Sequence, residues 1–125
     1  MKALVLIAHG SRREASNDEV LILSEAIAQD MKNEYPIVQA GFLELAQPSI
    51  TGAINNCVQL GATEVCVVPF FLSNGRHVYE DVPGEVNKAR QVHGDIAIII
   101  TPHIGESPKM KDLIRDTVIR GDLSA

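Results

Sequence analysis

The feature that most constrains the fold is a regular alternation between short apolar runs and longer amphipathic segments. Residues 3–8 form an unbroken apolar run, ALVLIA, which is typical of a strand buried on both faces of a sheet. Similar runs at 37–45, 63–68 and 96–100 predict three further strands. Strands that alternate with helices predict a parallel sheet with right-handed crossovers and helices on both faces. We therefore expect residues 1–125 to form a single domain, a small doubly wound α/β sheet of about four parallel strands flanked by helices.

Helix signals fill the segments between the first three predicted strands. Ser16 followed by Glu19 fits a capping box at the start of a first helix, which should end near Glu34. Pro48 suits the first position of a second helix, and Gly61 suits the position just past its end. The first two strands are thus each followed by a helix signal, as the β-α alternation requires.

The second half of the chain predicts a loop and two more helices. Residues 72–79 contain Ser-Asn-Gly and predict a loop. The third helix is then expected to begin near Asp81, with Pro83 in its first turn. Ser107–Pro108 is expected to open a fourth helix, which Gly121 would end. The residues of this helix that are expected to face inward are Met110, Leu113, Ile114 and Val118.

Composition narrows the functional classes. The chain is 46% hydrophobic and 22% charged, which is ordinary for a folded globular domain. Its net charge of −5 argues against nucleic acid as a partner, because phosphate binding needs a basic face. Cys57 and Cys66 lie in apolar stretches and predict buried thiols without a disulfide. No apolar run is long enough for a membrane helix or a signal peptide, so we expect a cytoplasmic protein with no membrane partner.

Polar side chains able to bind a metal or move a proton follow every predicted strand. His9 follows the first strand and Glu44 ends the second. Arg76 and His77 lie in the loop after the third strand, and His103 follows the fourth. Because ligands of open α/β sheets bind at the carboxyl ends of the strands, we expect these side chains to share one edge. This convergence predicts a site for a metal ion or for proton transfer.

The residue types indicate what such a site could bind. Two histidines and a carboxylate suit Co²⁺, Ni²⁺, Fe²⁺ or Zn²⁺, and so few ligands could release the ion again. Arg12, Arg13 and Arg76 flank His9 and His77, which would suit a ligand with several carboxylates.

Less specific interpretations of the same residues stay open. Glu44 could be a surface carboxylate or a helix cap, His103 a loop residue, and the arginines solvated surface. His93, just before a glycine, is best explained as a cation at a helix carboxyl end.

Three ordered motifs resemble those of a known family. Residues 6–13, LIAHGSRR, resemble the N-terminal motif of the class II chelatases of the CbiX type, the sirohydrochlorin chelatases. Residues 42–48, FLELAQP, resemble their second motif. The segments 61–62, 67–72, 75–77 and 81–83 resemble their third. The resemblance covers at least residues 1–84, and the chain length suits the short, single-domain form.

The resemblance implies a chelatase-like fold and a lyase that inserts Co²⁺, Ni²⁺ or Fe²⁺ into sirohydrochlorin, an acidic tetrapyrrole, for cobalamin, nickel-cofactor or siroheme synthesis. It implies metal-binding and catalytic roles for His9 and His77, with Glu44 in support. The metal would be a substrate, and no organic cofactor is expected. We expect the substrate to contact Ser11, Arg12, Arg13, Arg76 and His103.

A homodimer is also expected. Longer relatives hold two such domains around a cleft, so a single-domain chain would need a second copy to enclose a broad macrocycle. The predicted contact includes the exposed apolar residues of the loop and helix around Phe70, Phe71, Leu72, Val78 and Val82.

Two other functional classes remain to be distinguished. A histidine phosphatase also places His-Gly after its first strand, but its motif needs arginine directly before that histidine, where this chain has Ala8. A carrier that binds the metal or the tetrapyrrole without inserting it would use the same residues, so turnover alone separates it from an enzyme. A dinucleotide enzyme is disfavoured because the Gly-x-Gly-x-x-Gly fingerprint is absent.

Overall fold

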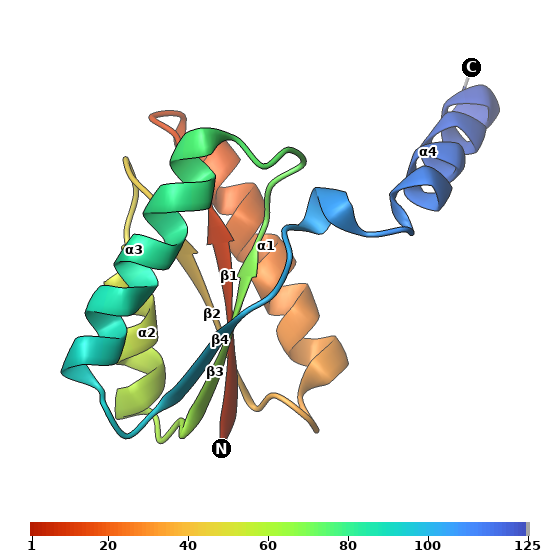
Figure 1. The fold of residues 1–125 in the computed structure, drawn as a ribbon. Coiled ribbons are helices and arrows are strands. Elements are labelled where there is room, and N and C mark those ends of the chain that lie inside the picture. The colour runs from red at the N-terminus through yellow and green to blue at the C-terminus, as the bar shows by residue number, and fades with distance from the viewer. Residues whose placement is uncertain (125) are drawn as a thin grey trace.

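The fold is a three-layer arrangement of helices around one parallel sheet (Figure 1). The structure, a computed structural model, describes residues 1–124, except for the side chains of residues 77, 123 and 124. The elements, in chain order, are β1 (Lys2–Ala8), α1 (Glu14–Met31), β2 (Ile37–Phe42), α2 (Ile50–Gln59), β3 (Glu64–Pro69), α3 (Arg76–Val92), β4 (Ala97–Ile100), the short 3₁₀ helix η1 (Ile104–Glu106) and α4 (Met110–Ser124).

The sheet confirms the predicted doubly wound α/β class. Its strand order is β2-β1-β3-β4, and every neighbouring pair is parallel. The chain moves outward from β1 to β2 and then crosses back over β1 to β3, so the winding reverses beside β1. The register pairs Ala8 with Phe42 and Ile7 with Pro69, so the carboxyl ends of these three strands reach one edge. That edge is where ligands of this class of sheet bind.

The main core lies between the sheet and the helices α2 and α3 (Figure 1). Every second residue of β1 faces this layer, as the two-residue period of a strand requires. The buried residues that form it include Val5, Ile7, Ile54, Val67, Val82 and Val86. Val82 is only 2% exposed, so its predicted place in a dimer contact is wrong.

The boundary of α1 differs from the prediction. The helix begins at Glu14, so Ser16 lies inside its first turn and forms no capping box. Ser11 and Asn17 stabilise this end instead: the Asn17 side chain accepts from the Ser11 N–H at 3.0 Å and donates to the Ser11 carbonyl at 2.8 Å. The Arg13 N–H donates to Ser11 Oγ at 3.0 Å. This local network replaces the expected cap.

Two prolines also lie elsewhere than expected. Pro48 precedes the N-cap residue Ser49 rather than opening α2, and the Gln47–Pro48 peptide bond is cis. Pro83 lies in the interior of α3, because α3 begins at Arg76 rather than near Asp81. Gly61 ends α2 with a φ of +103°, as predicted.

The fourth helix is formed, but its predicted packing is wrong. Leu113, Ile114 and Val118, expected to face inward, are exposed. The connector after β4, residues 101–109, carries the chain away from its own sheet, and α4 stands apart from the body (Figure 1). Gly121 lies within α4 rather than at its end. Among the residues that the structure describes, no helix combines the length and the hydropathy needed to cross a bilayer.

Candidate functional site

The site is centred on a pair of side chains at the carboxyl edge of the sheet. His9 follows β1 and Glu44 lies just beyond β2, and His9 Nε2 is 3.0 Å from Glu44 Oε1. The side chains are 53% and 57% exposed, so both keep access to solvent. The predicted convergence of these two residues is therefore present in the structure.

Backbone hydrogen bonds beyond the strand ends hold this pair together. The Leu43 N–H donates to the Ala8 carbonyl at 2.9 Å, and the Glu44 N–H donates to the His9 carbonyl at 3.0 Å. The β1–β2 ladder thus continues as far as the two functional residues. Gly10, next to His9, has a φ of +93°, and a Cβ there would lie 1.7 Å from the Glu44 carbonyl oxygen. Only glycine allows this close approach.

An aromatic ring packs against the imidazole from the next strand. The Phe71 and His9 ring centroids are 6.5 Å apart and the planes are nearly perpendicular, at 88°. The Phe70 N–H donates to the Ile7 carbonyl at 2.7 Å, which fixes the segment after β3 against β1. The imidazole is thus held by Glu44 and by Phe71, while its remaining surface is open.

The pair lines an open, acidic hollow of about 460 Å³. Asp81 and Glu85 of α3 line it together with His9, Leu43 and Glu44. Neither Asp81 nor Glu85 is among the site residues predicted from the sequence. Their spacing of four residues puts them on one side of α3, and this signal was present in the sequence, but only side chains that follow strands were selected as site residues.

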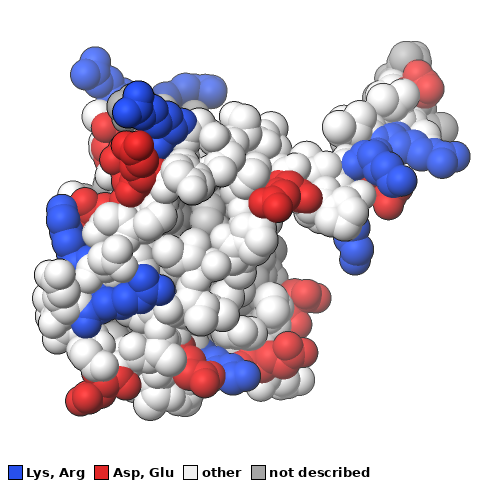
Figure 2. All heavy atoms as spheres, viewed as in Figure 1, with Lys and Arg blue, Asp and Glu red and all other residues white. Residues whose placement is uncertain are grey.

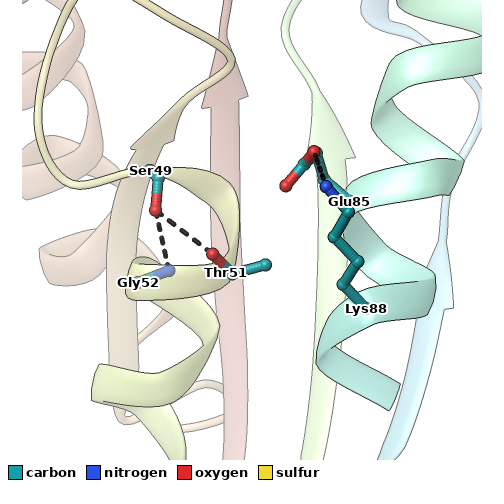
Figure 3. A network of polar contacts seen from close by, with 5 residues as sticks. All are labelled: Ser49, Thr51, Gly52, Glu85 and Lys88. Atoms are coloured by element: carbon teal, nitrogen blue, oxygen red, sulfur yellow. Dashed lines mark hydrogen bonds and ion pairs between the residues drawn. The ribbon is translucent and has the colours of Figure 1, made fainter. Parts of the chain in front are cut away.

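Short-range contacts fix the elements around the hollow (Figure 3). Ser49 Oγ accepts from the Gly52 N–H at 3.1 Å and lies 3.3 Å from Thr51 Oγ1, which caps α2 directly after the loop that carries Glu44. On α3, the Lys88 ammonium donates to Glu85 Oε1 at 2.9 Å. Glu85 is therefore oriented by a cation on its own helix.

The segment with Arg76 and His77 is helical, so the predicted loop is wrong in its second half. These are the first two residues of α3. The Arg76 side chain is exposed and donates from Nε to Glu80 Oε1 at 3.4 Å. The His77 side chain lies outside the part of the chain that the structure describes, so its role as a ligand stays a prediction.

His103 is not brought to His9. Its Nδ1 lies 3.6 Å from Glu106 Oε2, and both residues line a second hollow of about 440 Å³ between α3 and the end of β4. Asp81 lines the first hollow and Tyr79 the second, so α3 separates the two. Figure 2 shows that the face between α3 and the connector is hollowed and almost free of charged side chains.

The three remaining substrate-binding predictions lie at the start of α1. Arg12 and Arg13 are exposed and precede the first turn of the helix, close in sequence to His9. Ser11 is engaged through its backbone and hydroxyl in the local network with Arg13 and Asn17. These positions leave both guanidinium groups accessible to a ligand that covers the edge of the sheet.

The geometry suits a weakly held, exchangeable ion. Among the described residues no three His, Cys, Asp or Glu side chains converge as a complete metal cage. His9 and Glu44 can act as two ligands, or Glu44 can orient the imidazole while His9 binds the ion. Water would complete the coordination on the open side.

Most of the chain matches one known protein family. A model described as CbiX matches residues 3–120. The chain belongs to the CbiX family. The resemblance that the three sequence motifs suggested is thereby confirmed.

Curated relatives of this CbiX-family chain carry two kinds of name. It is 39% identical over 116 residues to the chloroplastic sirohydrochlorin ferrochelatase of Arabidopsis thaliana, covering 92% of this chain and 50% of the relative. It is 29% identical over 116 residues to the sirohydrochlorin cobaltochelatase of Sulfolobus acidocaldarius, covering 93% of this chain and 89% of the relative. The chain spans about half the length of several curated relatives that it matches.

Solved structures share the fold of this CbiX-family chain. A CbiX protein of Marinobacter aquaeolei VT8, described as a cobalamin biosynthesis protein, superposes with a TM-score of 0.82 at 28% identity and 100% coverage of both chains. SirB from Bacillus subtilis with Fe³⁺ superposes with a TM-score of 0.83 at 26% identity, covering 92% of this chain and 45% of SirB. The four-stranded sheet with its flanking helices is thus the fold of this family.

Proposed function

We propose that this chain is a sirohydrochlorin metal chelatase, a lyase that inserts a divalent ion into the macrocycle. The observation that carries the proposal is the His9–Glu44 pair, 3.0 Å apart and half exposed at the rim of an acidic hollow. Relatives are named sirohydrochlorin chelatases, for iron in Arabidopsis thaliana and for cobalt in Methanocaldococcus jannaschii. Co²⁺ is the ion we favour, with Ni²⁺ and Fe²⁺ as alternatives, since imidazole suits all three.

The proposed reaction assigns a role to each side chain of the hollow. His9 and Glu44 bind the incoming ion, with His77 as a further ligand. The carboxylates of Asp81 and Glu85 give the hollow a negative potential that attracts the cation. As the ion passes to the pyrrole nitrogens, two pyrrole N–H protons leave. Glu44 and the freed His9 can accept them, because both have access to solvent.

The proposed assembly is a homodimer of one chelatase-like domain, residues 1–125, in the cytoplasm. The first hollow is open, whereas small-molecule sites usually enclose most of their ligand. A second copy facing the carboxyl edge would complete the enclosure. We propose no organic cofactor, because the ion is a substrate and its transfer to the macrocycle needs no redox step.

Metal insertion by the purified chain is the first test. With sirohydrochlorin and Co²⁺, Ni²⁺ or Fe²⁺ in parallel, we expect the absorption spectrum to shift to that of the metallated macrocycle over many turnovers per chain. Controls without protein set the spontaneous rate. A carrier would bind the ion or the macrocycle and stop at a stoichiometric amount, which would contradict the enzyme proposal. Hydrolysis of a generic phosphate ester would instead support the phosphatase alternative.

The arginines near the site are expected to act on substrate affinity. Arg12→Ala and Arg76→Ala should each raise KM for sirohydrochlorin about tenfold, equal to about 1.4 kcal/mol, with a smaller change in kcat. Their carboxylate contacts would lie far from the reacting nitrogens and so stabilise ground state and transition state alike. The Arg76–Glu80 pair is exposed and easily exchanged for a substrate carboxylate. Steady-state kinetics measures both constants.

Lys32→Ala provides the matched control for this charge effect. Lys32 follows the last residue of α1, and α1 runs from the carboxyl edge of β1 back toward the start of β2. Removing this cation should leave KM unchanged. An unchanged KM in the Arg12 and Arg76 variants would show instead that these arginines are solvated surface only.

A further inference from the structure

Two exposed leucines lie on the loops that flank His9 at the carboxyl edge of the sheet. Leu45 lies beyond the end of β2 and Leu72 beyond the end of β3, while His9 follows β1, the strand between them. Leu45 is 54% exposed and Leu72 is 72% exposed. Figure 1 shows both loops at the end of the sheet toward which the β1 arrow points. Because neighbouring strands are about 4.8 Å apart, the two strands that lead to these leucines are separated by roughly 10 Å.

The backbone of Leu45 adopts a conformation that leucine disfavours. Its φ is +65°, and among the described residues it is the one non-glycine residue at positive φ. Its position is fixed by its neighbours: the Glu44 N–H donates to the His9 carbonyl at 3.0 Å, and the loop closes where the Phe42 N–H donates to the Pro48 carbonyl at 2.9 Å. Glycine or asparagine would adopt this φ more easily. The folded chain also gains little burial from this side chain, so the leucine points to a contact outside the chain.

The backbone of Leu72 is held by the connector that follows β4. The Gly105 N–H donates to the Phe71 carbonyl at 2.9 Å, and a Cβ on Gly105 would lie 1.7 Å from the Leu72 carbonyl oxygen. On the other side, the Phe70 N–H donates to the Ile7 carbonyl at 2.7 Å. Single exposed leucines are ordinary on protein surfaces. This one differs because its backbone is fixed tightly while its side chain stays in solvent.

We propose that Leu45 and Leu72 form the apolar surface against which one face of the tetrapyrrole ring lies while His9 delivers the ion. The inference rests on the proposed chelatase function and names residues that would hold its substrate. Metal–nitrogen bonds are about 2 Å long, so the ring nitrogens must come close to an ion held by His9. The ring is much broader than the ion. It must therefore also cover the residues beside the ligands, and Leu45 directly follows Glu44.

The charges around the leucines favour this substrate as the occupant. The ring of an acidic tetrapyrrole is apolar across its faces and carries its carboxylates at the periphery. The chain shows the matching pattern, with the leucines beside the ligand pair and the exposed Arg12, Arg13 and Arg76 on the surrounding segments. Arginine binds carboxylates in a bidentate manner, and leucine contributes contact without requiring a hydrogen bond. Together they would select a flat ring with a charged rim over an acyclic polycarboxylate.

Binding of metal-free sirohydrochlorin tests the two leucines without turnover. Leu45→Asn and Leu72→Asn should each raise its Kd about tenfold, because each removes apolar surface that the ring would cover. The Kd for Co²⁺ alone should stay unchanged, since His9 and Glu44 are kept. Leu60→Asn is the matched control: Leu60 is 55% exposed but follows α2 at the opposite edge of the sheet, so its loss should leave both constants unchanged.

Stability separates a substrate contact from a structural role for Leu45. Asparagine adopts positive φ more readily than leucine, so Leu45→Asn should raise the midpoint of urea unfolding while it weakens binding of the macrocycle. A leucine that stabilised the chain itself would give the reverse, a lower midpoint. That result would overturn the proposal for Leu45.

Two further outcomes would contradict the inference. An unchanged Kd for sirohydrochlorin in both leucine variants would show that the ring does not lie on these side chains. A lower mass of either variant in light scattering would assign the leucines to a contact between copies instead. Failure of the chelatase proposal is distinguishable, because a chain that binds the macrocycle through these leucines but inserts no ion would lose the proposed activity and keep the proposed surface.

Discussion

Replacing His9 by alanine is expected to lower the rate of metal insertion by at least about a hundredfold while the fold persists. Loss of a residue that only supports a metal ligand already costs ten- to a hundredfold, so loss of a ligand should reach the upper end or exceed it. The His9 side chain is half exposed, lies against Glu44 and Phe71, and is not part of the buried core. Its removal therefore leaves the core intact, and circular dichroism should be unchanged.

Two further variants make this result specific to the site. His93→Ala removes a histidine that caps the far end of α3 and should keep nearly normal activity. Glu44→Gln keeps the shape and a hydrogen-bonding oxygen but loses the charge. Its activity should therefore fall between those of His9→Ala and His93→Ala. Cobalt titration followed by absorbance would show the same order of affinity. Full activity in His9→Ala would remove the basis of the proposed metal site.

Replacing Gly10 by alanine is expected to destabilise the domain by about 3 kcal/mol or more, although the change adds one methyl group. A Cβ at this position would lie 1.7 Å from the Glu44 carbonyl oxygen, and the φ of +93° disfavours any side chain. The β1–β2 ladder must open to relieve this overlap, and it carries His9 and Glu44 with it. The midpoint of urea unfolding should fall, and metal insertion should be lost in the remaining folded protein.

Gly84 supplies the control for this prediction. It lies exposed in the interior of α3, and a Cβ there meets no atom within 4 Å. Gly84→Ala should therefore raise stability by about 0.5–1 kcal/mol, since alanine is the better helix former. Equal unfolding midpoints for the two variants would show that the tight approach at Gly10 carries no energetic weight.

The sheet and its edge could be predicted because strand patterns in this chain are local. The run before His9 is apolar at every position, as a central parallel strand must be, and topology then sends each strand end to one edge. The approach of His9 to Glu44 followed from that rule alone. The same rule placed His103 correctly at the end of β4 but not its side chain, which turns to Glu106.

The sequence-based predictions failed for features of the structure that depend on contacts between distant parts of the chain. Asp81 and Glu85 were missed because only side chains that follow strands were considered, whereas the hollow is also lined by one side of α3. The apolar stripe of α4 was recognised, but periodicity reports only that a face needs cover, not which surface provides it. The direction of the connector, which separates α4 from its own sheet, depends on contacts such as the Gly105 N–H donating to the Phe71 carbonyl at 2.9 Å.

The half-exposed state of His9 and Glu44 has a kinetic meaning. A chelatase must give up its ion once per turnover, so a long residence time would make the site a trap. The proposed ligands on an open rim would leave the remaining coordination positions to water, which exchanges readily. Discrimination between cobalt, nickel and iron would then depend on which ion the cell supplies, because an open pair imposes little geometric preference of its own.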